Sequence, residues 1–523
     1  MNVIQSTNNL TSSTTKLNDY GFVVSCLFYP AHGVQYWRLW FGAVCAAVTV
    51  LATNPMYSQS ELNDYSRLGQ NAIGTTLVSD YQAIGVNPAN LGFIPEEIIY
   101  EEPSPLQLQI SRRKRNWSVT LGELGVAVHS NAMNRSNLLD AVFSFNSEQF
   151  TLADKQKAAD NFTGKGVLLN ADAILLGGAY QSERYGGVAF SVRERVSAEF
   201  TFNASAAQLA FLGRYYSYFD SSYTREWDGT IIGYSRSPKL YSELFDSTRI
   251  SMMWTREYNV SYGRKIFGGI KNKWYLGIGL KYIVGYANLN SYVDENGQLN
   301  AYSAVTPLFN INYGKAVSPS KIDGTGMIPV GRGFGVDIGT TILISNKWRI
   351  GISVLDLGRM YWDGNVFKAE DYLLNGMSST GFNSYNIFTE AQKIQGEGGF
   401  KWAGLSSIES TLPTRIRLGV SRNIGVMRDI GMDIIIPATS LQPGNLSEVM
   451  FSLGAAYQIR SWLHVNGGFT FGGSMGFNMP AGVMFSIFDG FWELGLSTRD
   501  LLTYISAKDP TLSIGVATAR FRF

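Results

Sequence analysis

Hydrophobic and polar residues alternate along much of the chain in segments of about ten residues. In the clearest segment, residues 274–286, one face carries Trp274, Leu276, Ile278, Leu280, Tyr282, Val284 and Tyr286. The opposite face is small and includes Lys281. Because a β-strand points successive side chains to opposite faces, this pattern predicts a strand with one wholly apolar side. With a tilt of about 40° the segment would stand about 30 Å tall, which matches a bilayer with an aromatic residue at each interface.

The alternation recurs along the chain and predicts about fourteen antiparallel strands. One such strand would also fit a soluble sandwich, but a long series favours an all-β transmembrane barrel. The connections are alternately long and short, as in outer-membrane barrels with short periplasmic turns, which would place Phe523 at the periplasmic end. Residues 106–110 and 308–313 could raise the count to about sixteen. The predicted strands are residues 117–128, 167–180, 188–202, 250–266, 274–286, 334–344, 348–357, 416–424, 430–436, 449–459, 463–471, 481–487, 492–501 and 511–523.

Composition supports a barrel in a membrane. Charged residues make up 16% of the chain, against about 25% in ordinary soluble proteins. Aromatic residues reach 13%, 55 of the 523 residues are glycine, and mean hydropathy is −0.02. Apolar and polar positions cancel in the average of a transmembrane barrel, whereas a helical membrane protein shows runs of about 20 apolar residues. The net charge of +2 argues against nucleic acid as a partner.

The one long apolar run, residues 39–52, follows Arg38 and precedes small and polar residues. This pattern predicts a signal segment, residues 1–59, with cleavage near Ser58 or Ser60. A lipoprotein signal ending at Cys26 is the alternative, although no long apolar run precedes it. Both cysteines of the chain, Cys26 and Cys45, would be removed, so the mature protein would have no disulfide and no thiolate metal site.

Two segments between the strands have helical patterns. Residues 152–162 predict a helix with Thr151 as N-cap and Asp154 three residues later. Residues 206–213 predict a second, short helix. Both lie in long connections and are expected outside the membrane.

A further segment carries the most specific motif of the chain. Residues 68–74 (LGQNAIG) are followed by residues 80–83 (DYQA) and by Asn87, Pro88 and Ala89. This order resembles the N-terminal plug of the FadL/TodX family of outer-membrane proteins. Residues 333–339, 353–358, Trp362 and residues 412–413 more closely resemble an uncharacterised Bacteroidota family related to FadL.

The resemblance implies a barrel of about fourteen strands with a lumenal plug, passing hydrophobic small molecules. It divides the chain into a signal segment (1–59), a plug (60–100) and a barrel with long extracellular loops (101–523). The plug motif would consist of Asn87, Pro88 and Ala89, and it would form the turn between the plug and the barrel wall. They would also suit an ordinary turn, because proline fixes φ and asparagine suits the preceding position.

Charged residues that lie opposite apolar faces should point into the lumen, because a charge at the bilayer midplane costs about 2–4 kcal/mol. They could hold the plug in place, or they could gate or line a path. Acidic residues of the plug, Glu61, Asp64 or Asp80, could neutralise some of the positive charge. The predicted lumen-facing residues are Arg193, Arg195, Glu199, Lys281, Asp337, Arg349, Arg415, Arg417 and Arg460.

Three other kinds of pattern bear on whether the chain could carry out chemistry. Residues 472–476 match G-x-S-x-G, with His464 upstream, but hydrolases place this motif on a strand–turn–helix elbow rather than between two strands. Residues 112–115 form a basic run that suits a solvated turn, or contact with lipid phosphates or an acidic partner. Metal-ligand spacing and phosphate loops are absent from the sequence. We therefore predict no enzymatic activity, no metal and no cofactor.

Two functions are compatible with this sequence. The first is an outer-membrane, FadL-like barrel that admits a hydrophobic or amphipathic molecule. The second is a non-transporting scaffold or accessory subunit of a Bacteroidota outer-membrane complex for secretion or barrel assembly. The expected partners are outer-membrane lipid, a possible hydrophobic ligand and possible proteins of such a complex. A continuous apolar pocket would favour transport, whereas a lumen filled with paired charges would favour the scaffold.

Overall fold

A computed structural model of the protein describes residues 73–94, 96–104, 107–143, 149–269, 271–387, 390, 400–425, 428–439, 442–506, 508 and 510–523. The predicted signal segment and residues 60–72 of the predicted plug lie outside these ranges. No helix in the described ranges is long and apolar enough to cross a membrane.

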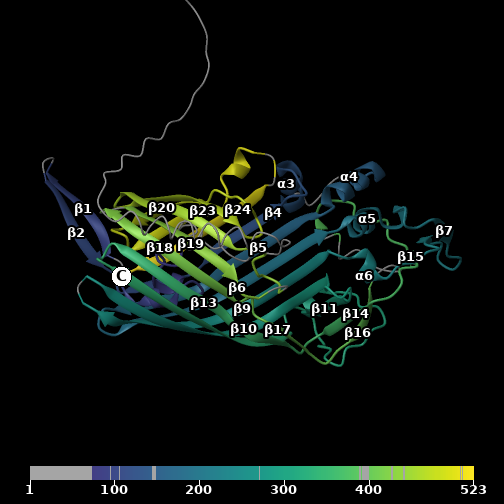
Figure 1. Cartoon of the computed structure of the whole chain (residues 1–523), viewed down its shortest axis with the longest axis horizontal. Helices are drawn as coiled ribbons and strands as arrows, with labels where there is room; N and C mark the ends of the chain where they lie inside the picture. Colours follow the sequence, from purple (N-terminus) through teal and green to yellow (C-terminus); the bar gives the residue numbers. More distant parts are fainter. Residues whose placement is uncertain are drawn as a thin grey trace, which may run out of the picture. The chain divides into compact units, whose positions relative to one another are not determined.

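The described chain is dominated by one closed antiparallel sheet (Figure 1). Going once around the ring gives fourteen strands, with β3 and β4 as two halves of the first. The fold and strand number predicted from the alternation are thereby confirmed. The strands are β3 (Trp117–Thr120), β4 (Glu123–Ser130), β5 (Lys165–Ser182), β6 (Gly186–Phe202), β9 (Arg249–Gly268), β10 (Lys273–Val293), β12 (Gly331–Ile344), β13 (Trp348–Trp362), β18 (Arg415–Gly425), β19 (Arg428–Pro437), β20 (Met450–Arg460), β21 (Leu463–Gly472), β22 (Ala481–Ile487), β23 (Trp492–Thr498) and β24 (Thr511–Arg522).

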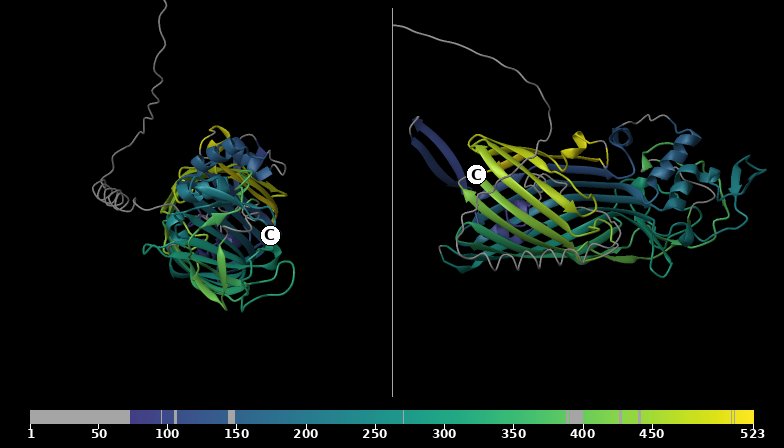
Figure 2. Two further views of the ribbon diagram at one scale, coloured as in Figure 1. Left: turned by 90° about the vertical axis from the view of Figure 1, so that its right-hand side faces the viewer. Right: turned by 45° about the horizontal axis from the view of Figure 1, so that its top comes forward.

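The barrel closes where its last strand meets its first. The backbone N–H of Trp117 donates to the carbonyl of Phe523 at 2.9 Å, and the N–H of Phe523 donates back at 3.0 Å. Short turns such as β5–β6 and β12–β13 share the end of the barrel that carries Phe523, and the long connections lie at the other end (Figures 1 and 2). Since outer-membrane barrels have short periplasmic turns, we refer to these ends as periplasmic and extracellular.

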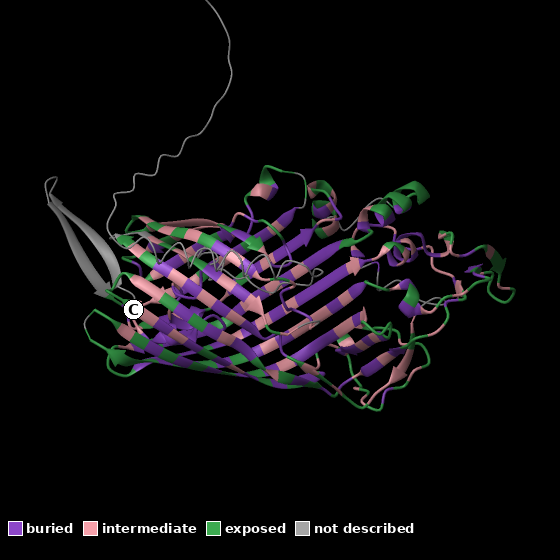
Figure 3. Ribbon diagram, in the orientation of Figure 1, coloured by how far each residue is buried: buried purple, intermediate pink, exposed green. Residues whose placement is uncertain are grey.

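Burial alternates along the strands, as the checkered ribbon of Figure 3 shows. On β10, Ile278 and Leu280 are 48% and 59% exposed, whereas Lys281 is buried. Because the sheet is closed, the exposed apolar side chains face outward and the buried polar ones face the lumen. This arrangement reverses that of a soluble protein and matches a barrel surrounded by lipid.

The extracellular end carries short helices and additional strands. The helices are α3 (Arg135–Phe143), α4 (Leu152–Phe162), α5 (Ala204–Leu212) and α6 (Tyr241–Leu244), and a cluster around Phe162 and Phe211 packs α3–α5 onto the ends of β4–β6. The predicted capping box of α4 is present: Thr151 caps the helix, and its hydrogen bonds lower the pKa of the Asp154 carboxyl. The additional strands are β7 (Ser221–Thr224), β8 (Ile231–Tyr234), β11 (Leu299–Val305), β14 (Val366–Glu370), β15 (Gly376–Met377), β16 (Lys401–Gly404) and β17 (Ile408–Thr411).

A hairpin of β1 (Glu96–Ser104) and β2 (Gln107–Lys114) precedes the barrel and forms a two-stranded sheet of its own. It lies at the periplasmic end (Figure 1). The barrel sheet therefore begins at Trp117 rather than at residue 101, where the sequence analysis drew the boundary, because residues 96–114 pair with each other instead of with the wall.

Candidate functional site in the barrel lumen

Residues 73–92, here called the lumenal segment, lie inside the barrel near its periplasmic end. The segment contains two short 3-10 helices, η1 (Asp80–Ala83) and η2 (Pro88–Gly92), and nearly all of its residues are buried. Its side chains bond to inward-facing groups on strands on both sides of the ring, as the next paragraphs describe. The left view of Figure 2 shows the segment, in purple, within the ring of strands.

Glycines on the inner wall make room for this segment. A Cβ atom at Gly277 would lie 2.2 Å from the carbonyl carbon of Pro88, and one at Gly339 would lie 2.1 Å from Oδ1 of Asn87. Both distances are too short for any side chain, so the backbone of the segment approaches the wall only because these residues have none. Similar contacts, at up to 3.1 Å, surround the segment at Gly177, Gly187, Gly263, Gly351, Gly419 and Gly431.

A buried carboxylate binds the start of the segment to β18 and β19. Asp433 accepts hydrogen bonds from the backbone N–H and hydroxyl of Thr75, at 2.9 and 2.7 Å. Arg417 pairs with the same carboxylate at 3.2 Å and donates to the Thr75 hydroxyl at 3.1 Å. All three side chains are buried, so the ion pair is shielded from solvent and its polar atoms depend on each other.

The Asn-Pro-Ala motif both forms a turn and contacts the wall. The Asn87 side chain accepts from the backbone N–H of Ala89 and caps η2, with Pro88 at its first position. The same side chain donates to the hydroxyl of Thr341 on β12 at 2.9 Å, and that hydroxyl donates to Asn90 at 2.7 Å. The motif is therefore a turn whose first side chain also bonds to the wall.

A third anchor joins η1 to the last strand. Arg520 on β24 donates to Asp80 at 2.8 Å and pairs with Glu493 on β23 at 3.1 Å. The Tyr81 hydroxyl donates to Glu123 on β4. Of the acidic residues expected to neutralise lumenal cations, Asp80 is in this position, whereas Glu61 and Asp64 lie outside the described ranges.

A layer of buried ion pairs spans the inner wall on the extracellular side of the segment; we call it the ionic layer. Its centre is Asp356 on β13, which pairs with Lys281, with Arg415 at 2.7 Å and with Arg195 at 3.6 Å. Lys281 also pairs with Asp337 at 2.9 Å. These residues come from β6, β10, β12, β13 and β18. Each charge is buried yet has an opposite partner, which is the condition under which charges are tolerated in a low dielectric.

The ionic layer continues along the neighbouring strands. Arg195 donates to Glu257 at 2.8 Å, and Arg193 pairs with Asp172. Nearer the extracellular end, Arg249 donates to Glu199 at 3.0 Å. The lumen at this level is therefore lined by matched charges rather than by an excess of positive charge.

Most of the charged residues singled out in the sequence are brought together here. Arg193, Arg195, Glu199, Lys281, Asp337, Arg415 and Arg417 are buried in the ion pairs just described. Arg349 is partly buried and lies over the ring of Phe93, with its guanidinium carbon 5.8 Å from the ring centre. Arg460 is exposed, contrary to expectation, because the alternation of β20 breaks at an irregularity between Gln458 and Arg460, beside the turn.

The acidic partners of these cations were not predicted from the sequence. Asp172, Glu257 and Asp433 lie on inward positions of predicted strands, so the alternation could have identified them. Asp356 could not be found in this way, because alternation from Ile352 and Val354 would place it on the lipid face. A β-bulge in β13, with Asp356 at φ +57°, shifts the strand by one position and turns this carboxylate into the lumen.

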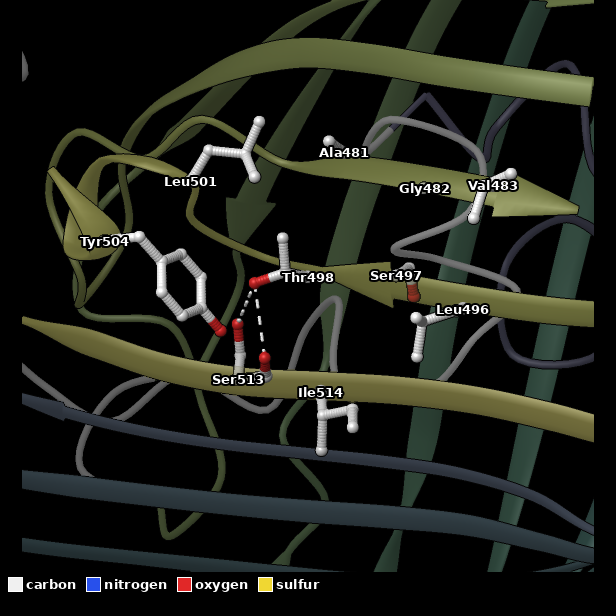
Figure 4. A pocket seen from close by; sticks show the side chains of 10 residues that line it. All are labelled: Ala481, Gly482, Val483, Leu496, Ser497, Thr498, Leu501, Tyr504, Ser513 and Ile514. Atoms are coloured by element: carbon white, nitrogen blue, oxygen red, sulfur yellow. Dashed lines mark hydrogen bonds between the residues drawn. The ribbon is translucent and has the colours of Figure 1, made fainter. Parts of the chain in front are cut away.

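A shallow apolar depression lies on the wall formed by β22, β23 and β24, with a volume of about 420 Å³ (Figure 4). Leu496, Tyr504 and Ile514 line it and are about half exposed. At its floor, the Thr498 hydroxyl donates to the carbonyl of Ser513 at 3.2 Å, and the two hydroxyls lie 3.1 Å apart. Paired backbone positions of β23 and β24 extend only to Ser497 and Gly515, so these hydroxyls join the two strands just beyond their last backbone pair.

The remaining motifs do not form catalytic arrangements. His464 lies at the start of β21 and Ser474 lies two residues beyond its end, and the Ser474 hydroxyl donates to the Ser447 hydroxyl at 2.9 Å. In the basic run, Arg115 is buried and donates to the carbonyl of Arg522 at 2.6 Å, and Lys114 pairs with Glu183. No group of three or more metal-ligating side chains occurs within the described ranges.

A closed sheet with an apolar outer face and a charged interior defines the class of this protein. It is a multi-pass β-barrel of the outer membrane of a Gram-negative bacterium. Residues 110–491 match the model of the family described as "Family of unknown function (DUF5723)", and the chain belongs to that family. No curated protein matches the chain.

Among solved structures, the chain is similar at low identity to two toluene transporters and to a FadL homologue. The toluene transporter TodX of Pseudomonas putida is 9% identical, with 89% of this chain and 99% of TodX covered and a TM-score of 0.42. The toluene transporter TbuX of Ralstonia pickettii is 12% identical, with 89% and 99% covered and a TM-score of 0.39. A FadL homologue of Pseudomonas aeruginosa is 9% identical, with 90% and 98% covered and a TM-score of 0.37.

Proposed function

We propose that this protein admits a hydrophobic or amphipathic small molecule across the outer membrane, with the lumenal segment as its plug. The observation that carries the proposal is the way in which this segment is held. Separate clusters around Asp433, Thr341 and Arg520 bind it to different parts of the wall. Such hydrogen bonds can be exchanged for water one cluster at a time, so the segment can leave the wall while the barrel stays closed.

The plug in this proposal begins at residue 60, after a signal segment of residues 1–59, and ends before the β1–β2 hairpin. The apolar depression beside Leu496 offers such a molecule a first contact at the wall. The protein carries out no chemistry in this scheme, needs no cofactor, and its partners are outer-membrane lipid and the transported molecule.

The test measures entry of toluene and of dodecanoate into cells of a Gram-negative host with and without the full chain. Faster entry of either probe with the protein present supports transport. A variant lacking residues 60–92 should raise passive leakage and change the uptake of the hydrophobic probe. Uptake equal to that of cells without the protein, for both probes and both variants, would refute the proposal.

A second function is favoured by the ionic layer. Paired charges that span the lumen suit a barrel that transports nothing and serves as a scaffold or accessory subunit of an outer-membrane complex. In this alternative, the complex would be a Bacteroidota outer-membrane machine for secretion or barrel assembly. In this case the deletion of residues 60–92 should loosen the barrel without changing uptake. Cross-linking in the native membrane should then recover a constant set of partner proteins, and recovery of none would argue against the scaffold.

A further inference from the structure

The connection between β19 and β20 leaves the wall at the extracellular end and turns into the barrel. Residues 442–446, here called the strap, are largely buried, with Asn445 and Leu446 at 2% and 3% exposure. Leu446 packs with Ile435 and Met450 on the inner side of the two strands from which the strap comes. An outer loop that followed the usual course over the rim would be exposed instead.

The tip of the strap touches the opposite wall. A Cβ atom at Gly444 would lie 3.0 Å from the hydroxyl of Ser197 on β6 and 3.2 Å from the terminal methyl of Met253 on β9. In the order of the ring, β6 and β9 are the third and fourth strands and β19 and β20 are the ninth and tenth. Since the ring has fourteen strands, these two pairs face each other across the lumen.

The strap lies on the extracellular side of the ionic layer. Ser197 follows Arg195 by two residues on β6, which runs toward the extracellular end, and Met253 precedes Glu257 by four residues on the antiparallel β9. The order along the barrel axis is therefore lumenal segment, ionic layer and strap.

The Ser197 hydroxyl makes no hydrogen bond to the strap. It is buried and has no hydrogen-bond partner among the residues that the structure describes, and beside it the Cβ position of Gly444 meets the methyl group of Met253 on β9. A permanent attachment would be expected to satisfy that hydroxyl. Gly444 has φ +82°, so the tip is a turn that a residue with a side chain adopts less readily.

We propose that the strap is a second closure of the barrel, in series with the plug, and that it must leave Ser197 for a molecule to pass. This inference rests on the proposed transport function and adds a moving part on the extracellular side. The plug then seals the lumen from the periplasm, while the strap decides which molecules reach it from outside.

A disulfide across the lumen tests the closure directly. The Cβ position of Gly444 lies 3.9 Å from Cβ of Ser197, within the range of about 3.5–4.5 Å found in disulfides. The test protein is the full chain with S197C and G444C, and with Cys26 and Cys45 replaced by alanine. The matched control is S197C with G476C, because Gly476 also has positive φ but has no neighbour within 4 Å of its Cβ position.

Oxidation should remove the free thiols of the S197C/G444C protein but not those of the control, as counted with a maleimide reagent. The oxidised protein should then admit toluene and dodecanoate at least about ten times more slowly, and a reducing agent should restore entry. Absence of the disulfide would overturn the placement of the strap. A disulfide that leaves entry unchanged, in a protein whose cysteine-free form transports, would overturn the closure. If the cysteine-free form transports neither probe, the proposed function fails and the closure fails with it, although disulfide formation still reports where the strap lies.

Discussion

The two sides of the barrel use buried charge differently. The long flank, β5, β6, β9, β10, β12 and β13, has strands of 14 to 21 residues, and most of its ion pairs join strands of that flank. Asp356 on β13 also pairs with Arg415 on β18. The short flank, β18–β24, has strands of 7 to 12 residues. There, Asp433 and Arg520 bind the lumenal segment, and the β19–β20 connection supplies the strap. Most charges of the long flank thus find partners within that flank, whereas the short flank supplies the strap and two of the three anchors of the lumenal segment.

The largest loss of stability is expected at the centre of the ionic layer. Asp356→Asn keeps the shape of the side chain and suits the left-handed backbone, but it leaves Lys281, Arg415 and Arg195 without their shared carboxylate. Removing one partner of a buried ion pair costs about 3–5 kcal/mol. Reversible urea unfolding in lipid vesicles, followed by tryptophan fluorescence, should show this loss.

The control for this variant is Glu409→Gln. Glu409 pairs with Arg359 at 3.6 Å, and both side chains are more than half exposed, so removal of its charge should change stability by less than about 1 kcal/mol. Equal losses for the two variants would contradict the idea that the long flank depends on its buried charges.

A charged side chain on the outer face of either flank should lower the free energy of unfolding nearly as much as Asp356→Asn does. Leu280 on β10 and Leu453 on β20 are 59% and 50% exposed and face lipid. Leu280→Arg and Leu453→Arg should each lower the free energy of unfolding by about 2–4 kcal/mol if both sites lie near the bilayer midplane. A loss confined to Leu280→Arg would mean that the flanks differ outside as well as inside.

As an independent check, a bilayer-confined probe should label cysteines at 278 and 280 but not at 279 and 281.

A single methyl group should disturb the seating of the lumenal segment. At Gly277 on the long flank, the new Cβ would lie 2.2 Å from the Pro88 carbonyl carbon, so Gly277→Ala forces the segment away from the wall. Overpacking of this kind costs about 1–3 kcal/mol and should raise the passive entry of small dyes. Gly467→Ala on the short flank is the control, because its nearest contact would be 3.8 Å. Leakage in both variants would remove the link to the segment.

The smallest effect is expected at the seam between β23 and β24. Thr498→Val removes the hydroxyl that bonds to Ser513 but keeps the shape of the side chain. The loss should be about 0.5–1.5 kcal/mol. Hydrogen exchange measured by mass spectrometry should quicken in residues 511–515 and stay unchanged in β10. Uniformly faster exchange would show that the seam is not a local weak point of the short flank.

Several features of the fold could be read from the chain because they depend on local periodicity. The alternation of residues 274–286, 334–344 and 348–357 predicted strands whose observed bounds, in β10, β12 and β13, differ mainly by extension at their ends. The helix after Thr151 was predicted to the residue, because a capping box is a signal within four residues. The alternation did not predict where strands end, because β10 continues past the apolar alternation to pair with β11.

The sequence predicted only part of the candidate site. Alternation assigned Lys281 and Asp337 to the lumen, but it could not pair them, because partners such as Asp356 and Arg415 are far apart in sequence. It also misjudged positions beside irregularities: the bulge turns Asp356 inward, and Arg460 ends exposed. No pattern in residues 442–446 indicated that this connection would enter the barrel.

The sequence by itself therefore determined a transmembrane barrel of about fourteen strands, because lipid outside and a polar lumen inside impose a two-residue period on every strand. Tertiary structure decided which charges meet, which glycines make room for the lumenal segment and where the strap crosses. Those features depend on register, bulges and ring closure, which bring distant strands together and leave no periodic trace in the chain.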